Sequence, residues 1–301
     1  MPSKERDAVS ERERCVTGIE GIDHILNGGI PRGNTVLISG SVGTGKTSIC
    51  IEFLIRGALS SENSLYLSVT EPTDKLLKNV IPFDFFDDKL IKQGKLQFLD
   101  LPRIYEKLGI DKDELSFEEG RLLVDTIVGL VEENHVRRLV LDSATSVAYR
   151  LKEQERIRDF LLRLGLALSA KNCTSLIVAE TGHNGEAYSR WGVEEALADG
   201  VIVTGNLERR GDLLRTLQVV KMRGTPHSRA KYVLDLSTSG VLLVPLLKGG
   251  SVSGGGCRER GHGGQRQADA PPGGLRRRPA SEGGPVLRRD PGDAGPLREQ
   301  E

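Results

Sequence analysis

The amino-acid sequence predicts an α/β fold, with a mostly parallel, twisted sheet flanked by helices and an antiparallel C-terminal extension. Between residues 35 and 180, short apolar runs alternate with amphipathic runs at helical spacing. Alternation of this kind places the strands in parallel and the helices on the faces of the sheet. After Gly200 the helical spacing stops and four strand-like runs follow one another, which predicts the antiparallel extension. A glycine-rich phosphate-loop motif lies at residues 40–47, between the strand predicted at 35–40 and the helix predicted at 46–59.

The individual elements follow from local composition. Apolar, β-branched runs predict strands at residues 35–40, 64–70, 95–100, 137–143 and 173–180. Apolar side chains three and four positions apart predict helices at residues 46–59, 72–80, 117–135 and 153–172. Pro72 suits the start of its helix, because a residue of the first turn needs no partner for a backbone N–H. The four later strands are predicted at residues 200–208, 213–222, 230–237 and 240–246.

The charge balance argues against a uniformly basic nucleic-acid binder. The 301 residues carry 42 Lys and Arg and 42 Asp and Glu, so the formal net charge is zero. Binding to a phosphate backbone requires a surplus of positive charge on the contacting surface, which a local basic patch could still supply. Nucleic acid is therefore a possible but unfavoured partner.

Composition divides the chain into three segments. Residues 1–15 are polar and are predicted to be disordered, and residues 16–247 form the predicted folded domain. Residues 248–301 are rich in Gly, Pro and Arg and contain no aromatic residue, so they cannot bury enough apolar surface to offset their ordering entropy. We predict a disordered, solvated tail, with contact between the arginines at 276–278 and an acidic partner as the alternative. The abrupt change of composition at Lys248 is also what an out-of-frame extension of the coding sequence would produce.

The sequence predicts a cytoplasmic protein without a membrane segment. The N-terminal residues "MPSKERDAVSERERC" are charged and have no apolar stretch of the kind found in a signal peptide. No apolar run approaches the roughly 20 residues that span a bilayer. The four cysteines are scattered and lack metal-ligand spacing, which is typical of free thiols in a reducing compartment.

The clearest motif is "GSVGTGKT" at residues 40–47, which satisfies G-x-x-x-x-G-K-[ST]. It follows a strand and precedes a helix, so backbone N–H groups and the helix N-terminus can face phosphate. Lys46 is expected to reach the β- and γ-phosphates, and the Thr47 hydroxyl is expected to ligate magnesium. A glycine-rich turn without a ligand is the alternative, which we disfavour because both flanking elements fit. The predicted nucleotide-binding residues are Gly40, Ser41, Val42, Gly43, Thr44, Gly45, Lys46, Thr47 and Ser48.

Asp142 is the candidate magnesium carboxylate. It closes the apolar strand "LVLD", where triphosphatases with this loop place the carboxylate that orients Mg²⁺. A turn or helix cap formed by Asp142 or Ser143 is the structural alternative. Because the phosphate-loop motif is present in the same chain, we favour a magnesium site made by Thr47 and Asp142.

Several spaced blocks resemble the KaiC-like ATPases of the RecA superfamily. The segment "GIEGIDHILNGGIPRGNTVLISGSVGTGKTS" resembles the start of the family's ATPase domain. The blocks "LVLDSATSV", "SRWGVEEALADGVIV" and "VVKMRGTPHS" resemble later parts of that domain, in the same order. The resemblance covers a single domain over about residues 15–247, whereas the circadian clock protein carries two such domains in tandem.

This resemblance implies a RecA-like P-loop NTPase core that binds ATP with Mg²⁺ and forms a ring-type homo-oligomer with nucleotide between subunits. It also implies that the family's K-x-R-G-T block, here Lys221, Arg223, Gly224 and Thr225, reaches a neighbour's phosphates. Positions i and i+2 on a strand share one face, so the two cations are expected side by side. A solvated strand face with unrelated charges is the alternative, and we favour the phosphate contact.

Hydrolysis needs a group that orients and deprotonates water, and here the sequence departs from the family. KaiC-like proteins usually end the strand before the second helix with two adjacent glutamates, whereas this chain has Thr70 and Glu71. Glu71 is the candidate catalytic base beside Lys46, with stabilisation of the following helix N-terminus as an equal alternative. Glu180 ends the strand "LIVAE" and is the other catalytic candidate, with γ-phosphate sensing or loop capping as further roles.

The motifs and the resemblance leave three candidate functions. The favoured one is a slow, magnesium-dependent ATPase that acts as an oligomeric regulatory switch for an unnamed signalling protein. A DNA recombination or repair ATPase similar to RecA or RadA is the second, and salt-dependent binding of single-stranded DNA would distinguish it. The missing first glutamate motivates the third, an ATP-binding scaffold that does not hydrolyse its nucleotide.

Overall fold

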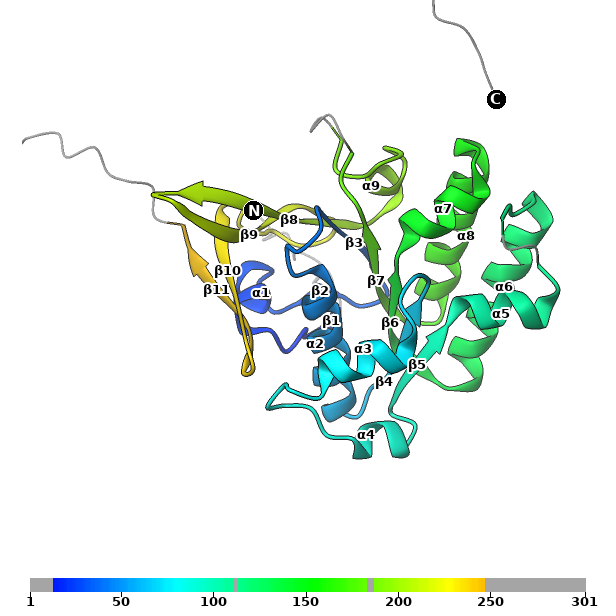
Figure 1. The fold of residues 1–301 in the computed structure, drawn as a ribbon, viewed down its shortest axis with the longest axis horizontal. Coiled ribbons are helices and arrows are strands. Elements are labelled where there is room, and N and C mark those ends of the chain that lie inside the picture. Colours follow the sequence, from blue (N-terminus) through cyan, green and yellow to red (C-terminus); the bar gives the residue numbers. More distant parts are fainter. Residues whose placement is uncertain (1–12, 111–112, 183–186, 247–301) are drawn as a thin grey trace, which may run out of the picture. The chain divides into compact units, whose positions relative to one another are not determined.

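The computed structural model describes residues 13–110, 113–182 and 187–246, which build a nine-stranded sheet with helices on both faces (Figure 1). The strands are β3 (Thr35–Gly40), β4 (Asn63–Ser68), β5 (Leu96–Asp100), β6 (Val136–Asp142), β7 (Thr174–Ala179), β8 (Gly200–Arg209), β9 (Asp212–Met222), β10 (Lys231–Ser237) and β11 (Gly240–Pro245). A separate antiparallel pair is formed by β1 (Arg14–Cys15) and β2 (Ile30–Pro31).

The sheet has the order β11-β10-β9-β8-β3-β7-β6-β4-β5. The six strands from β8 to β5 run parallel to one another, whereas β9, β10 and β11 add an antiparallel meander at the β8 edge. The predicted fold class, a mostly parallel sheet with an antiparallel C-terminal extension, is therefore confirmed. Strand β3 lies inside the sheet between β8 and β7, and the phosphate-loop motif leaves from its carboxyl end.

The helices are α1 (Glu20–Ile25), α2 (Lys46–Leu59), α3 (Thr73–Val80), α4 (Lys89–Lys92), α5 (Leu101–Leu108), α6 (Phe117–Glu133), α7 (Ala144–Leu151), α8 (Gln154–Ala170) and α9 (Glu194–Leu197). Helices α1 to α4 pack on one face of the sheet, and α5 to α8 pack on the other. Each face therefore has its own hydrophobic core, as expected when crossover helices cover a parallel sheet on both sides.

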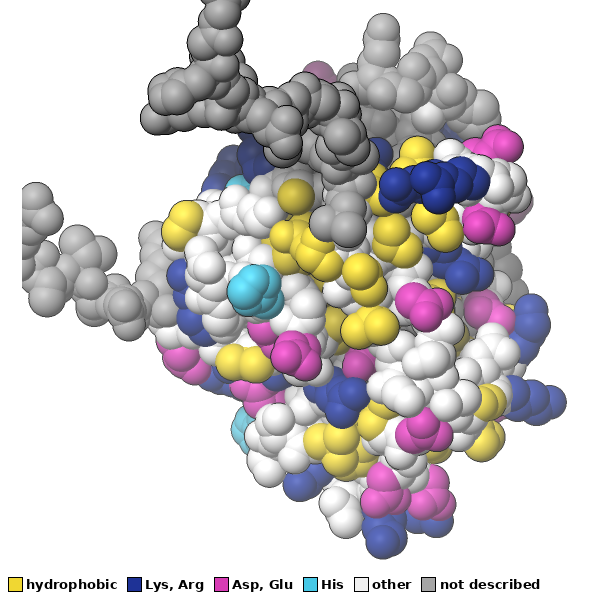
Figure 2. Space-filling model, turned by 90° about the vertical axis from the view of Figure 1, so that its left-hand side faces the viewer, with side chains coloured by type: hydrophobic (Ala, Val, Ile, Leu, Met, Phe, Trp, Pro, Cys, Tyr) yellow, Lys and Arg dark blue, Asp and Glu magenta, His cyan; other side chains and the backbone are white. Residues whose placement is uncertain are grey.

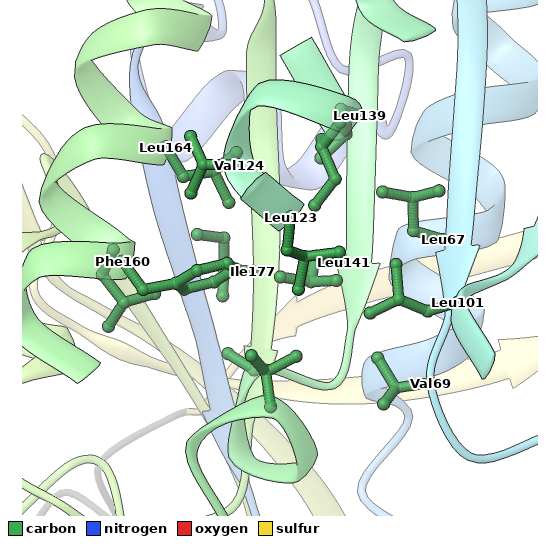
Figure 3. Packing of buried hydrophobic residues seen from close by; sticks show 14 of the residues in the cluster. Leu67, Val69, Leu101, Leu123, Val124, Leu139, Leu141, Phe160, Leu164 and Ile177 are labelled. Carbon is green, nitrogen blue, oxygen red and sulfur yellow. The ribbon is translucent and has the colours of Figure 1, made fainter. Parts of the chain in front are cut away.

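Strand alternation sorts the apolar side chains between these two cores. In β4, Leu65 and Leu67 point toward α5–α8, whereas Tyr66 points toward α2. Figure 3 shows the first core, in which strand residues meet the inner faces of α6 and α8. The labelled side chains there include Leu67, Leu139, Leu141 and Ile177 of the sheet and Leu123, Val124, Phe160 and Leu164 of the helices.

Local chemistry sets several helix boundaries. Helix α6 begins with a capping box, in which the Ser116 hydroxyl accepts from the Glu119 N–H and the Glu119 carboxylate accepts from the Ser116 N–H. Helix α5 ends at Gly109, which adopts a left-handed φ of 67°. The predicted long helices and strands agree with the structure to within two residues at each end, which is the usual uncertainty of helix ends.

Five helices, α1, α4, α5, α7 and α9, were not predicted from the sequence, and α4 and α9 have only four residues each. Helix α1 spans only six residues, too short for a clear apolar period. Helix α7 has the short sequence "ATSVAYRL", in which Thr145 and Val147 are β-branched, and it packs against β7 and α8. Helix α5 does have a usable signal, since Leu101, Ile104, Tyr105 and Leu108 recur at helical spacing directly after β5.

The N-terminal boundary of the fold also differs from the prediction. Arg14 and Cys15, assigned above to a disordered segment, form β1, and Cys15 is fully buried. The Arg14 guanidinium donates to the carbonyls of Leu26 and Gly29 and to the Thr225 hydroxyl, and these contacts hold the strand in place. The predicted tail at 248–301 lies outside the described residues.

The surface that carries the antiparallel strands is mixed in character. Figure 2 views this side and shows hydrophobic side chains gathered among acidic and basic ones. The exposed apolar residues of the meander include Leu213, Leu242 and Val244. Within the described ranges no helix combines the length and the apolar character needed to cross a bilayer.

Candidate nucleotide-binding site

The phosphate-loop motif folds as a tight turn between β3 and α2. Gly43 and Gly45 have left-handed φ values of 78° and 95°, which favour glycine. Gly40 is required for a different reason, because a Cβ there would lie 2.1 Å from the Thr204 hydroxyl oxygen on β8. The loop conformation is thus set by its own backbone and by the neighbouring strand. Helix α2 begins directly after the loop, at Lys46, so its N-terminus faces the same site.

Lys46 is folded back onto the loop. Its Nζ donates to the carbonyl oxygens of Gly40 and Ser41 at 2.7 and 2.8 Å. Burial lowers the pKa of Lys46, and the nearby carboxylates of Asp142 and Glu180 oppose that shift. A partly buried ammonium group held by two carbonyls is a cation available to an anionic ligand.

Asp142 ends β6 and lies below the loop, as predicted. Its Oδ2 accepts from the Thr47 hydroxyl at 3.2 Å and from the Tyr66 hydroxyl at 2.5 Å. Burial raises the pKa of Asp142, and the hydrogen bonds from Tyr66 and Thr47 counteract part of that effect. A hydroxyl and a carboxylate brought together in this way form the hard oxygen donor set that Mg²⁺ prefers, so these residues fit the ion.

A cavity of about 510 Å³ lies over loop residues 42–48. Thr70, Asp142, Glu180 and Arg215 contribute to its walls. The motif residues, the carboxylate at the end of β6 and the carboxylate after β7 therefore meet in one place. Strand-end positions of this kind are where ligands bind in open α/β sheets.

The two candidate bases are placed differently. Glu180 lines the cavity, and its backbone N–H donates to the Thr145 hydroxyl at 3.0 Å. The Glu71 carboxylate instead pairs with Lys75 at 3.3 Å, and Thr70 is the residue of that turn that lines the cavity. The role of each carboxylate stays a prediction, and the geometry favours Glu180.

Lys221 and Arg223 lie at the opposite end of the sheet from the loop. Lys221 pairs with Val201, which pairs with Leu37 near the start of β3, and Arg223 follows the end of β9. Both cations reach the segment after α9, since Lys221 Nζ donates to the Ala198 carbonyl at 2.6 Å and Arg223 forms an ion pair with Asp199 at 3.3 Å. Burial and the charge of Arg223 lower the pKa of Lys221. Neither cation contributes to the cavity over the loop of its own chain.

Sequence reasoning missed three features of this site. Arg215 on β9 donates through Nε to the Gly43 carbonyl at 3.0 Å. Leu234 and Leu236 of β10 pack against Gly45, so the antiparallel meander supports the loop. Tyr66 binds Asp142 from β4. The first two depend on strand register and had no local signal, whereas a tyrosine inside the apolar run "SLYLSV" is a signal that could have been used.

The fold and this cavity define a P-loop NTPase-type domain of the RecA superfamily. The family model described as "ATPase: KaiC" matches residues 15–248, and the chain belongs to this KaiC family of ATPases. The predicted family is therefore confirmed, and membership supports an ATP-binding ATPase.

Individual relatives give the same assignment. The chain is 33% identical over 236 residues to a UPF0273 protein of Thermotoga maritima, covering 77% of this chain and 96% of the relative. It is 32% identical to the circadian clock oscillator protein KaiC of Synechococcus elongatus, but the match spans 44% of that protein and 76% of this chain. A crystal structure of a KaiC-like protein from Pyrococcus horikoshii superposes with a TM-score of 0.66 at 31% identity, covering 78% of this chain and all of that one. A single KaiC-like domain fits these matches.

Proposed function

We propose that this chain is a slow, magnesium-dependent ATPase that works as a homo-oligomeric regulatory switch. The observation that carries the proposal is the meeting of Lys46, Thr47 and Asp142 below one cavity at the carboxyl end of β3. This combination supplies a cation for the phosphates and oxygen donors for the metal.

In this proposal each residue has a separate task. The backbone N–H groups of the loop and the N-terminus of α2 bind the phosphates, and Lys46 Nζ moves from the loop carbonyls to the β- and γ-phosphates. Thr47 and Asp142 hold magnesium, which supplies neutralisation of the phosphate oxygens. Glu180 accepts the proton of the attacking water, because its carboxylate lines the cavity and that of Glu71 is engaged by Lys75.

The oligomer is supported by the position of Lys221 and Arg223. Because both lie at the far end of β3 from the loop, a phosphate that they touch belongs to another copy of the chain. A hollow of about 180 Å³ beside Arg223 is walled by Leu162 and Leu166, and the Leu166 side chain is 64% exposed. On the side of the phosphate loop, Val42 is 83% exposed. Neighbouring exposed apolar residues rimmed by polar and charged ones are typical of a protein interface.

A non-hydrolysing ATP-binding scaffold is the second candidate. It is favoured by one observation, the presence of the Thr70 side chain at the cavity wall in the turn where a carboxylate is expected. In that case the nucleotide would stabilise the oligomer without turnover. The signalling partner and the cytoplasmic location remain part of the proposal.

The test is steady-state ATP hydrolysis measured together with the mass of the assembly, with and without ATP and magnesium. We expect slow phosphate release and a larger mass in the presence of ATP and magnesium. Assembly without phosphate release supports the scaffold, and a monomer without turnover contradicts both candidates.

A further inference from the structure

Tyr66 is a buried tyrosine whose hydroxyl meets the candidate magnesium carboxylate. Its side chain is 1% exposed, and its ring packs against Phe98 with 5.7 Å between the ring centroids. The phenol O–H donates to Asp142 Oδ2 at 2.5 Å. The parallel register explains this contact, because Tyr66 of β4 lies opposite Val140 of the neighbouring strand β6, and Val140 and Asp142, two residues apart, share one face of the sheet.

The contact divides the two oxygens of the carboxylate. Oδ2 accepts from both the Tyr66 hydroxyl and the Thr47 hydroxyl. Among the residues that the structure describes, no hydrogen bond reaches Oδ1. A carboxylate held through one oxygen cannot rotate freely, so the other oxygen keeps a fixed direction.

We propose that Tyr66 is a positioning residue, whose hydroxyl fixes the Asp142 carboxylate so that its free oxygen is presented to magnesium. This role rests on the proposed function, because it assigns a task to a residue behind the metal donors. The hydroxyl does not touch nucleotide, since Tyr66 does not line the cavity. Without it, Asp142 would lose its shorter hydrogen bond and would be held by Thr47 alone, the residue expected to turn toward the metal.

The decisive variant is Tyr66→Phe, which removes one oxygen and keeps the ring. Tyr105→Phe is the matched control, because Tyr105 is also fully buried but belongs to the core on the other face of the sheet. The probe is ADP, which avoids turnover, and its affinity is measured by calorimetry in EDTA and again in excess magnesium. Melting temperature is recorded for every variant.

We expect Tyr66→Phe to bind ADP in EDTA as the parent does, and to lose about tenfold of the gain in affinity that magnesium gives, which is the size expected for a hydrogen bond to a charged group. Tyr105→Phe should keep the full gain. In an Asp142→Asn background, Tyr66→Phe should change the magnesium response no further, because the two residues act through one group.

Three results would overturn this role. One is an unchanged magnesium gain in Tyr66→Phe. Another is a large fall in melting temperature with parallel loss of ADP binding in EDTA, which would show that the hydroxyl serves the fold. The third is equal binding of ADP by the parent protein with and without magnesium. That result would contradict the proposed function itself, and it is told apart from the other two because it is measured on the parent alone.

Discussion

At the scale of single residues, the cavity over the phosphate loop is lined by charged side chains whose partial burial destabilises the fold. Asp142 is partly buried, and this burial raises its pKa above the ordinary value of 3.8. Lys46 is partly buried, and its pKa is lowered for the same reason. Groups of this kind cost stability when no ligand is bound and are typical of functional sites.

Asp142→Asn should therefore raise the melting temperature of the nucleotide-free protein at neutral pH, by about 2–4 °C for each kcal/mol gained. The raised pKa of Asp142 determines how the stability difference between parent and variant changes with pH. A carboxyl group with a raised pKa in the folded state contributes most favourably below its ordinary value of 3.8, and that contribution is lost as pH rises through the raised pKa. The advantage of the variant should thus be small at pH 4 and grow toward neutrality in scanning calorimetry. An advantage that shrinks with rising pH would contradict the argument.

Changes at the carboxylates around the cavity should separate the two candidate bases. Glu180→Gln should reduce ATP turnover by about 10²–10⁴-fold with little change in ATP affinity, whereas Glu71→Gln should act weakly because its partner is Lys75. Thr70→Glu should raise turnover, since residue 70 lines the cavity. Phosphate release under saturating ATP measures all three. Loss of turnover in Glu71→Gln alone would restore Glu71 as the base.

At the scale of elements, an arginine–glutamate cluster joins the start of the fold to the sheet. Arg138 of β6 is 3% exposed and donates to the carbonyls of Val16 and Phe53 at 2.7 and 2.8 Å. The Glu62 carboxylate accepts from Arg138 and from Arg32, each at 2.5 Å. Helix α2 has Gly57 at this point because a Cβ would lie 2.3 Å from the Arg138 side chain. The cluster thereby joins the C-terminal half of α2 and the start of the fold to β6.

Glu62→Gln should destabilise the protein by about 3 kcal/mol, because it leaves the buried Arg138 guanidinium without its anion and Arg32 with only the exposed Glu13. Burial alone would raise the pKa of Glu62, but the hydrogen bonds and charges of Arg32 and Arg138 outweigh it and lower the pKa. The stabilisation is therefore present above the ordinary value of 4.5 and is lost as pH falls through the lowered pKa. Urea unfolding of the parent and variant should converge at low pH.

Glu114→Gln is the matched control for this cluster. Glu114 also contacts two cations, Lys152 and Arg156, but the pairs are exposed and should contribute little. An equal loss of stability in both variants would show that burial is not what gives the Glu62 cluster its strength.

The elements differ in how well the sequence predicts them. The parallel strands and the long helices have strong apolar patterns, and the loop motif has a fixed spacing, so all were predictable. The short helices α1 and α7 depend on packing that no local pattern encodes. The contacts of Arg215 with Gly43 and of Tyr66 with Asp142 depend on which strands are neighbours and in which register. Glu71 was a candidate base from its place in the chain, with a helix-end role as an equal alternative, and in the structure its carboxylate pairs with Lys75.

At the scale of the whole molecule, the described domain places Lys46 far from the second pair of cations, Lys221 and Arg223. Lys46 lies at the carboxyl end of β3, and Lys221 and Arg223 lie at the other end of the same region of the sheet. If both sets serve one reaction, the reaction takes place between copies of the chain, and activity depends on assembly.

Mixing two inactive variants tests this arrangement. Lys221→Ala/Arg223→Ala subunits retain the loop, and Lys46→Ala subunits retain the two distant cations. A mixture should recover part of the ATP hydrolysis, because some interfaces join an intact loop to intact cations. Each variant alone serves as the control. No recovery across mixing ratios, with assembly confirmed by mass, would indicate that the cations act within their own chain or not at all.

We expect residues 40–48 to bind ATP. Calorimetric titration of ATP with magnesium into the parent and into Lys46→Ala measures this binding directly. The parent should bind one ATP for each chain, and the variant should bind at least about tenfold more weakly, because a charge-assisted contact with phosphate is lost. Matching melting curves would show that the variant is folded. Equal ATP affinity in the two folded proteins would contradict the assignment of the site.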